Sequence, residues 1–270
     1  MSEKERILEI LNKYNLKAKK SFGQNFLINE GIINRIVKSL NVSSFDYVIE
    51  IGPGLGSLTS YIIKEAKNII AVDADRDMIM VLNDLYSNCL NLKLVQSDFL
   101  KYDPNLDSTA NNRLFVGNLP YNITSELIEY FLKCDFKKMA IMVQKEVAFK
   151  LDYQENKKDC SYLGAFLKTF CNYQLITKVD SSCFYPQPKV DSAFISFDKI
   201  KEIEFNLYPI YKALFKDPNK VISNCLRQNP KYKDFILTSN ELLSYRARQL
   251  DVNTLYKLSK EIDNYYKKRI

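Results

Sequence analysis

Short apolar runs alternate with helix-periodic segments along most of this 270-residue chain, and this alternation constrains its fold more than any other feature. Each run ends at a glycine or a polar residue, as buried strands do. The predicted strands are residues 47–51, 68–73, 92–96, 113–118 and 138–144. The predicted helices among and after them are residues 57–66, 76–87, 124–133 and 145–151. The order favours an α/β fold around a parallel, doubly wound sheet.

The two ends of the chain follow other patterns. A capping box, Ser2-x-x-Glu5, predicts an N-terminal helix. The further predicted elements are a helix over 29–40, a polar surface loop over 103–112, and late strands near 172–179 and 192–197. After residue 200 strand signals give way to short amphipathic segments at 206–215, 219–228, 239–245 and 252–266. We therefore expect two domains, an α/β domain over 1–200 that includes a helical and basic segment over 1–40, and a small basic helical domain over 201–270.

Composition excludes several kinds of chemistry. The chain has no histidine, which removes the usual general base, every Ser-His-Asp or Cys-His scheme and the commonest metal ligand. Its six cysteines form no Cys-x-x-Cys pair and match no zinc spacing, so we interpret them as reduced thiols. No metal is implied. The reaction, if there is one, needs little proton abstraction or depends on a cofactor.

Charge is distributed unevenly along the chain. The formal net charge is +7, with 25 basic against 24 acidic residues in 1–200 and 14 against 8 in 201–270. The basic excess indicates either a solvated helical surface or a surface for nucleic acid. No apolar run is long enough to span a membrane, and no signal peptide is visible at the N-terminus. A cytoplasmic location is the expectation.

A glycine-rich loop, "VIEIGPGLGSLT" (48–59), follows a predicted strand and opens a helix. Gly52, Gly54 and Gly56 let the backbone approach a ligand. The spacing is neither the Gly-x-Gly-x-x-Gly of dinucleotide binders nor a P-loop. Glu50 precedes the loop, and a carboxylate there suits a cation better than a pyrophosphate. The loop therefore fits the sulfonium cofactor S-adenosylmethionine better than NAD.

Two more carboxylates follow predicted strands. Asp73 ends the next strand, about 20 residues after the loop, where doubly wound sheets bind a ribose diol. It could instead cap the following helix. Asp98, in "VQSDFL", could accept a hydrogen bond from an adenine amino group or could be a turn residue.

Asn118-Leu119-Pro120-Tyr121 interrupts an apolar run just before a predicted helix. Asn and Pro favour turns for local backbone reasons, and Tyr121 could cap a core. The alternative is a site that binds a flat, nitrogen-rich group. The tetrapeptide alone favours neither interpretation.

Five motifs occur in register along the chain: "QNFL" (24–27), "EIGPGLGSLT" (50–59), "QSDFL" (96–100), "GNLPYNITS" (117–125) and "FYPQPKVDSAF" (184–194). Together they resemble the universal small-subunit (16S-type) rRNA adenine N6,N6-dimethyltransferases, closely over residues 16–200 and loosely beyond. The resemblance implies a Rossmann-like class I S-adenosylmethionine-dependent methyltransferase domain with a small C-terminal α-helical domain. The product of the cofactor would be S-adenosylhomocysteine.

The resemblance also assigns roles to residues. The implied cofactor contacts are Asn25, Leu27, Gly52, Asp73, Asp98 and Asn118, beside the loop residues Glu50, Gly54 and Gly56. Asp73 departs from the glutamate that is usual in relatives. Residues Asn118 to Tyr121 would hold the target adenine, and Phe184 would close its other face.

Physical chemistry agrees with these roles. The adenine N6 amine is a poor nucleophile because its lone pair is delocalised into the ring. Hydrogen-bond acceptors at the Asn118 side-chain oxygen and the Leu119 carbonyl would favour a pyramidal nitrogen. Pro120 would fix that carbonyl, and Tyr121 would supply a stacking surface. No strong base is required, in agreement with the absence of histidine.

The family modifies two adjacent adenosines in a hairpin loop near the 3′ end of small-subunit rRNA, so the implied partner is an immature small subunit. We expect a monomer that binds phosphates through "KAKKS" (17–21) and the C-terminal domain. Relatives commonly carry an Arg-Arg-Lys cluster there, whereas this chain has Lys216, Lys220 and Arg227 with Asp217. The alternatives are a macrolide-resistance methyltransferase of large-subunit rRNA, a non-enzymatic nucleic-acid-binding relative and a DNA adenine methyltransferase.

Overall fold

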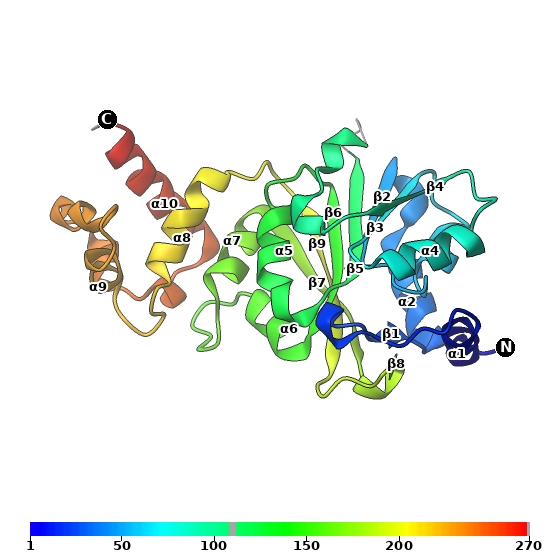
Figure 1. Cartoon of the computed structure of the whole chain (residues 1–270). Coiled ribbons are helices and arrows are strands. Elements are labelled where there is room, and N and C mark those ends of the chain that lie inside the picture. Colours follow the sequence, from blue (N-terminus) through cyan, green and yellow to red (C-terminus); the bar gives the residue numbers. More distant parts are fainter. Residues whose placement is uncertain (108–111, 269–270) are drawn as a thin grey trace. The chain divides into compact units, whose positions relative to one another are not determined.

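A computed structural model describes residues 1–107 and 112–268, and Figure 1 follows its elements along the chain. Part of the polar loop that we expected over 103–112 falls outside these ranges, namely residues 108–111. The preceding Pro104–Leu106 forms a 3-10 turn.

The described chain divides into two compact units. Unit 1 combines residues 1–145 with 174–198, and unit 2 combines 146–173 with the residues from 199 onward. The expected boundary near 200 lies beside the second junction, but residues 146–173 group with the C-terminal segment instead of with the α/β unit. Unit 1 contains 20 basic and 20 acidic residues, so the entire formal charge of +7 belongs to unit 2.

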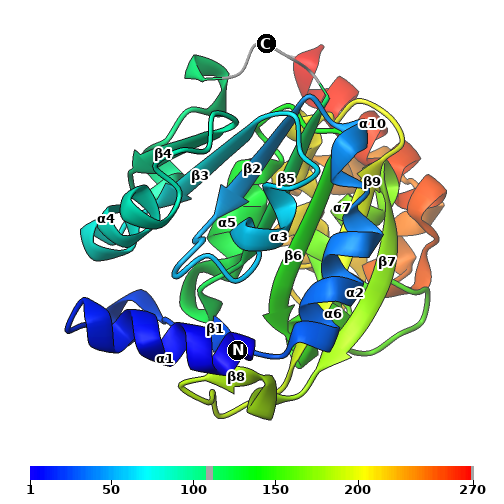
Figure 2. The same cartoon turned by 90° about the vertical axis from the view of Figure 1, so that its right-hand side faces the viewer.

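A seven-stranded sheet is the centre of the fold (Figure 2). Its strands, in spatial order, are β4 (Leu92–Gln96), β3 (Ile69–Asp73), β2 (Tyr47–Ile51), β5 (Arg113–Asn118), β6 (Lys138–Gln144), β9 (Ser192–Lys199) and β7 (Cys171–Val179). The first five are mutually parallel, which confirms the predicted α/β class. β9 is antiparallel to β6. Hydrophobic periodicity carries no information on strand direction, so this reversal was not predicted.

Alternating side chains along β5 build two hydrophobic layers. Leu114 and Val116 belong to a buried cluster with α2 (Glu30–Leu40) and with residues at and around α3 (Thr59–Ile62). Phe115 points to the opposite face and stacks on Phe131, with ring centroids 5.2 Å apart. The two-residue period of a strand places neighbours on opposite faces, so one strand serves both layers.

The remaining elements of unit 1 are α1 (Glu3–Lys13), α4 (Arg76–Leu85), α5 (Thr124–Phe131) and a two-stranded pair of β1 (Phe26–Leu27) with β8 (Phe184–Tyr185). Apolar side chains of α1 form a second buried cluster with Leu55 of the glycine loop and with α4. The N-terminal helix is therefore part of the support beneath the glycine loop.

Unit 2 is helical. Its helices are α6 (Lys145–Leu151), α7 (Tyr162–Phe170), α8 (Tyr208–Leu214), α9 (Ile222–Arg227) and α10 (Val252–Lys267). Phe166 contacts Tyr208 and Tyr211 edge to face, with centroids 5.2 Å apart in each pair. α7 was not predicted. Seven of its nine residues are buried, so its sequence lacks the polar face that gives a surface helix its periodicity.

Candidate functional site

A cavity of about 280 Å³ lies in unit 1, against the carboxyl ends of the parallel strands. Segments that follow β2, β3, β4 and β5 form its wall, together with residues 21–27. The predicted site residues that line it are Asn25, Leu27, Glu50, Gly52, Gly54, Asp73, Asp98, Asn118 and Pro120. Open α/β sheets bind ligands at this edge, because the loops after the strands converge there.

Two of the three loop glycines face the cavity. Gly52 and Gly54 both have left-handed backbone conformations, with φ of 65° and 55°. A Cβ on Gly54 would also lie 3.1 Å from the Phe26 ring. Gly56 does not line the cavity; a Cβ there would lie 3.1 Å from Leu82. The structure thus gives Gly56 a packing role.

Glu50 is the most deeply buried carboxyl group of the site, with 1% of its surface exposed. Burial raises its pKa to about 7, the hydroxyl of Thr59 opposes the rise by donating a 2.7 Å hydrogen bond, and the neighbouring charge of Asp73 adds to it. A positively charged ligand in the cavity would reverse this effect by stabilising the carboxylate.

Asp73 holds the glycine loop while facing the cavity. Its carboxylate accepts hydrogen bonds from the backbone N–H groups of Gly54 (3.2 Å) and Asp75 (2.8 Å). Burial raises its pKa to about 6 despite these donors. The cap of α4 is Asp75, not Asp73, so the alternative role that the sequence left open for Asp73 is not the one observed.

Asp98 is a turn residue that also lies at the cavity, and its contact with an adenine amino group stays a prediction. It accepts a hydrogen bond from the backbone N–H of Leu100 (3.1 Å) and caps a 3-10 turn, as a turn residue would. It also lines the cavity. The side chain is 46% exposed and lies 4.0 Å from Lys101.

Asn118 ends β5 with its amide in a defined orientation. Its Nδ2 donates a 2.9 Å hydrogen bond to the carbonyl of Asn25. Since a carbonyl can only accept, the nitrogen must face Asn25 and the oxygen Oδ1 must face away from it. Within the described ranges Oδ1 accepts no hydrogen bond, which leaves it free to accept one from a ligand.

The rest of the tetrapeptide is firmly held. The Leu119 N–H donates to the Met142 carbonyl (3.3 Å), and the Thr124 hydroxyl donates to the Pro120 carbonyl (3.2 Å). The hydroxyl of Tyr121 lies 2.5 Å from that of Ser192. Pro120 lines the cavity, whereas Leu119 and Tyr121 lie outside it.

Phe184 is not brought to the cavity. It pairs with Leu27 across the β1–β8 ladder, and only 2% of its surface is exposed. Its ring belongs to the buried cluster that also contains Phe194. In this arrangement its position is that of a core residue, and its predicted contact with adenine remains untested.

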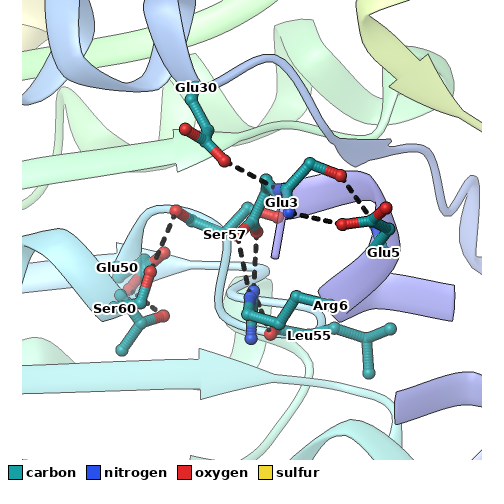
Figure 3. A network of polar contacts seen from close by, with 10 residues as sticks. Glu3, Glu5, Arg6, Glu30, Glu50, Leu55, Ser57 and Ser60 are labelled. Atoms are coloured by element: carbon teal, nitrogen blue, oxygen red, sulfur yellow. Dashed lines mark hydrogen bonds and ion pairs between the residues drawn. The ribbon is translucent and has the colours of Figure 1, made fainter. Parts of the chain in front are cut away.

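α1 contacts the glycine loop through polar side chains (Figure 3). These contacts were not predicted from the sequence. Arg6 donates to the Leu55 carbonyl (3.0 Å) and pairs with the buried carboxylate of Glu3 (2.7 Å). The Glu3 N–H in turn donates to Glu30 of α2 (2.9 Å). The capping box predicted the helix but contained no signal for these distant partners.

A second missed cluster anchors the segment that follows α1. The Lys19 ammonium lies 2.7 Å from both Asp75 and Asp77, and Gln24 donates a 2.8 Å hydrogen bond to Asp75. The carboxylate of Asp75 thereby fixes the segment that lines one wall of the cavity. Lys19 was predicted to bind phosphate with its neighbours in 17–21, but here it is engaged in these two ion pairs.

Neither a metal-binding cluster nor a disulfide occurs among the described residues. No cluster of three or more His, Cys, Asp or Glu side chains that could hold a metal is present in residues 1–107 and 112–268. All six cysteines are free thiols. In the same part of the chain no helix has the length and apolarity that a membrane crossing requires.

Comparison with known proteins identifies relatives. The family model described as ribosomal RNA adenine dimethylase matches residues 15–262. A ribosomal RNA small subunit methyltransferase A of Clostridium botulinum (strain Loch Maree) is 41% identical over 228 residues, which cover 81% of this chain and 83% of that protein. The same enzyme of Clostridium perfringens (strain SM101) is 39% identical over 197 residues, covering 72% and 69%.

Solved structures of other proteins also resemble this chain. A dimethyladenosine transferase from Plasmodium falciparum superposes with a TM-score of 0.74 at 26% identity and covers 88% of this chain and 98% of that one. The 23S rRNA methyltransferase ErmE, at 24% identity and a TM-score of 0.65, has the same fold over 88% of this chain and all of its own.

The sheet order, the cavity and these structures define a Rossmann-like methyltransferase. The chain belongs to the ribosomal RNA adenine dimethylase family.

Proposed function

We propose that this protein uses S-adenosylmethionine to dimethylate the N6 amines of two adjacent adenosines in a hairpin loop near the 3′ end of small-subunit rRNA. The observation that carries the proposal is the cavity, because Glu50 and Asp73, whose pKa values are raised, line it together with Asn118 at the end of β5. The relatives named as small-subunit methyltransferases support the choice of RNA.

The cavity fits the cofactor by charge and by hydrogen bonding. Glu50 and Asp73 favour a cationic ligand, and the cofactor carries a sulfonium and an ammonium group. Asp73 suits the ribose diol and Asp98 the adenine amino group, since both line the cavity and both can accept hydrogen bonds. Asn25, Leu27 and Gly52 complete the wall.

Catalysis would then consist mainly of alignment. S-adenosylmethionine supplies a methyl group that its sulfonium charge has already activated. Asn118 Oδ1 and the Leu119 carbonyl accept the N6 hydrogens and direct the nitrogen lone pair, while Tyr121 stacks on the base. Proximity and orientation can supply about 7–11 kcal/mol. The proton leaves to water after transfer, so the chain needs no histidine.

A base inside a helix could not reach this site, so the substrate would be a loop or flipped adenosine. Unit 2 carries the whole excess of positive charge and would bind rRNA phosphates. Its partner would be an immature small subunit in the cytoplasm, bound by a monomer of this protein.

The macrolide-resistance reaction on large-subunit rRNA is the second candidate. The ErmE likeness supports it only at the level of fold, whereas the relatives at 39–41% identity carry the small-subunit name. A non-enzymatic relative is disfavoured because the acceptor of Asn118 and the three predicted carboxyls, Glu50, Asp73 and Asp98, are all present at the cavity.

One experiment separates these functions. The purified protein is incubated with methyl-labelled S-adenosylmethionine and either unmethylated small subunits or large subunits, and the modified nucleotide is mapped by mass spectrometry. We expect N6,N6-dimethyladenosine in small-subunit rRNA alone. Label confined to large-subunit rRNA would overturn the proposal, and absence of label from both would favour the non-enzymatic alternative.

A further inference from the structure

Tyr121 and Ser192 join two of the sequence motifs through one short contact. Tyr121 opens the 3-10 turn that follows Pro120, and Ser192 is the first residue of β9. Their hydroxyl oxygens lie 2.5 Å apart, although 71 positions separate them in the chain. Neither residue lines the cavity, so the proposed cofactor contacts do not account for this bond.

The backbone around Ser192 is fixed on both sides. Ser192 pairs with Gln144 in the β6–β9 ladder and has 0% of its surface exposed. The preceding Asp191 accepts hydrogen bonds from the backbone N–H of Lys145 at its carbonyl (3.0 Å) and from that of Ser181 at its side chain (3.1 Å). The backbone that carries the Ser192 hydroxyl is therefore firmly held, and the hydroxyl is a buried anchor.

The Tyr121 ring is only half-buried, and a tyrosine side chain rotates about two bonds. Fixing the hydroxyl oxygen at the far end of the ring restricts the first rotation, about Cα–Cβ. That oxygen lies on the axis of the second rotation, which the bond restrains through its direction, because a phenol O–H prefers to lie in the plane of its ring. Burial raises the pKa of Tyr121, although the bond to Ser192 acts the other way, so the phenol stays protonated at neutral pH. The hydrogen bond to Ser192 consequently fixes where the ring lies and favours one orientation of its plane.

We propose that Ser192 is a positioning residue that holds the ring of Tyr121 in the plane on which the target adenine stacks. This inference rests on the proposed function, because it needs an adenine at Asn118. Stacking depends on the tilt and the separation of the two rings. A tilted ring would displace N6 from the acceptors of Asn118 and Leu119 in both methyl transfers.

The bond can be removed from either end. Tyr121→Phe deletes the phenolic oxygen and keeps the ring, and Ser192→Ala deletes the partner hydroxyl. The chain also offers a matched control. Ser196 lies four residues further along β9 and is equally buried, and in the described ranges its hydroxyl has no hydrogen-bond partner, so Ser196→Ala removes a buried hydroxyl without removing this bond.

The assay follows methylation of unmethylated small subunits and separates N6-methyladenosine from N6,N6-dimethyladenosine by mass spectrometry at equal conversion. We expect Tyr121→Phe and Ser192→Ala each to lower kcat/KM by about three- to tenfold, the net effect of one hydrogen bond. The double variant should match the single ones. Each should also raise the proportion of the monomethyl product, a ratio that does not depend on how much of the protein is active.

Calorimetric titration should give the same dissociation constant for S-adenosylmethionine in all variants, and Ser196→Ala should leave both rate and product ratio unchanged. The inference is overturned if Tyr121→Phe methylates as the unsubstituted protein does, or if the effects of the two substitutions multiply. Tyr121→Phe keeps the test decisive should Ser192→Ala fold poorly. No label with the unsubstituted protein would instead overturn the proposed function and, with it, this inference.

Discussion

Affinity for S-adenosylmethionine should rise with pH because two of the three carboxyls that line the cavity hold protons near neutrality. Glu50 has a pKa of about 7 and Asp73 a pKa of about 6 in the ligand-free protein. A cationic ligand favours their ionised forms, so binding must release whatever protons they carry. Affinity is consequently lowest below pH 6 and approaches its maximum above pH 8.

The magnitude follows from the two pKa values. Between pH 6 and pH 8 the ionised fraction rises about tenfold for Glu50 and about twofold for Asp73. If both must be ionised, the association constant increases about 20-fold over this range. At pH 7 binding should release about 0.6 proton, most of it from Glu50.

Isothermal titration in buffers of different ionisation enthalpy measures both quantities. Glu50→Gln keeps an acceptor for the Thr59 hydroxyl but cannot ionise, so its affinity should be lower at pH 8 and change only about twofold with pH. Asp98→Asn is a control that changes another cavity carboxylate and should retain the steep profile. An association constant that is flat or falls between pH 6 and pH 8 would refute the reasoning.

Three further perturbations address the other parts of the site. Asn118→Ala should abolish methyl transfer and change cofactor affinity only a few-fold, since the amide oxygen serves the base; unchanged turnover in the methylation assay contradicts this. Asp75→Ala should lower the free energy of unfolding in urea by about 2–4 kcal/mol, because it removes the cap of α4 and the buried partner of Lys19 and Gln24. The matched change in an exposed ion pair, Asp84→Ala, should have no measurable effect. RNA binding should weaken linearly in a plot of log affinity against log salt, and a flat plot would argue against phosphate binding by unit 2.

Elements that are local in sequence could be predicted closely. The strands at 92–96, 113–118 and 138–144 have the predicted bounds, because each is an apolar run that ends where polar residues begin. The helix predicted over 57–66 is shorter, with α3 confined to Thr59–Ile62, because turns flank it on both sides. Helix propensity alone does not predict where such turns replace the helix.

Contacts between distant positions could not be predicted. The bond from Lys19 to Asp75 spans 56 positions and that from Tyr121 to Ser192 spans 71. The sequence "KAKKS" does not show whether Lys19 binds a phosphate or, as observed, the carboxylates of Asp75 and Asp77. The motifs supplied most of the predicted residues that line the cavity, but only the fold shows which residues hold them in place.

The distribution of acidic groups explains how a methyltransferase of adenine can dispense with histidine. Both carboxyls with raised pKa values lie at the glycine loop and β3, where the positive cofactor is expected, and neither belongs to the Asn118–Tyr121 turn. In the proposed function, charge thus serves cofactor binding. At the turn the groups are neutral acceptors and an aromatic ring, and Asn118, Leu119 and Tyr121 each form a hydrogen bond to a distant residue. A general base at that turn would add little to the rate, because N6 loses its proton readily once it carries the transferred methyl group. A misplaced hydrogen-bond acceptor, in contrast, would impair both methyl transfers.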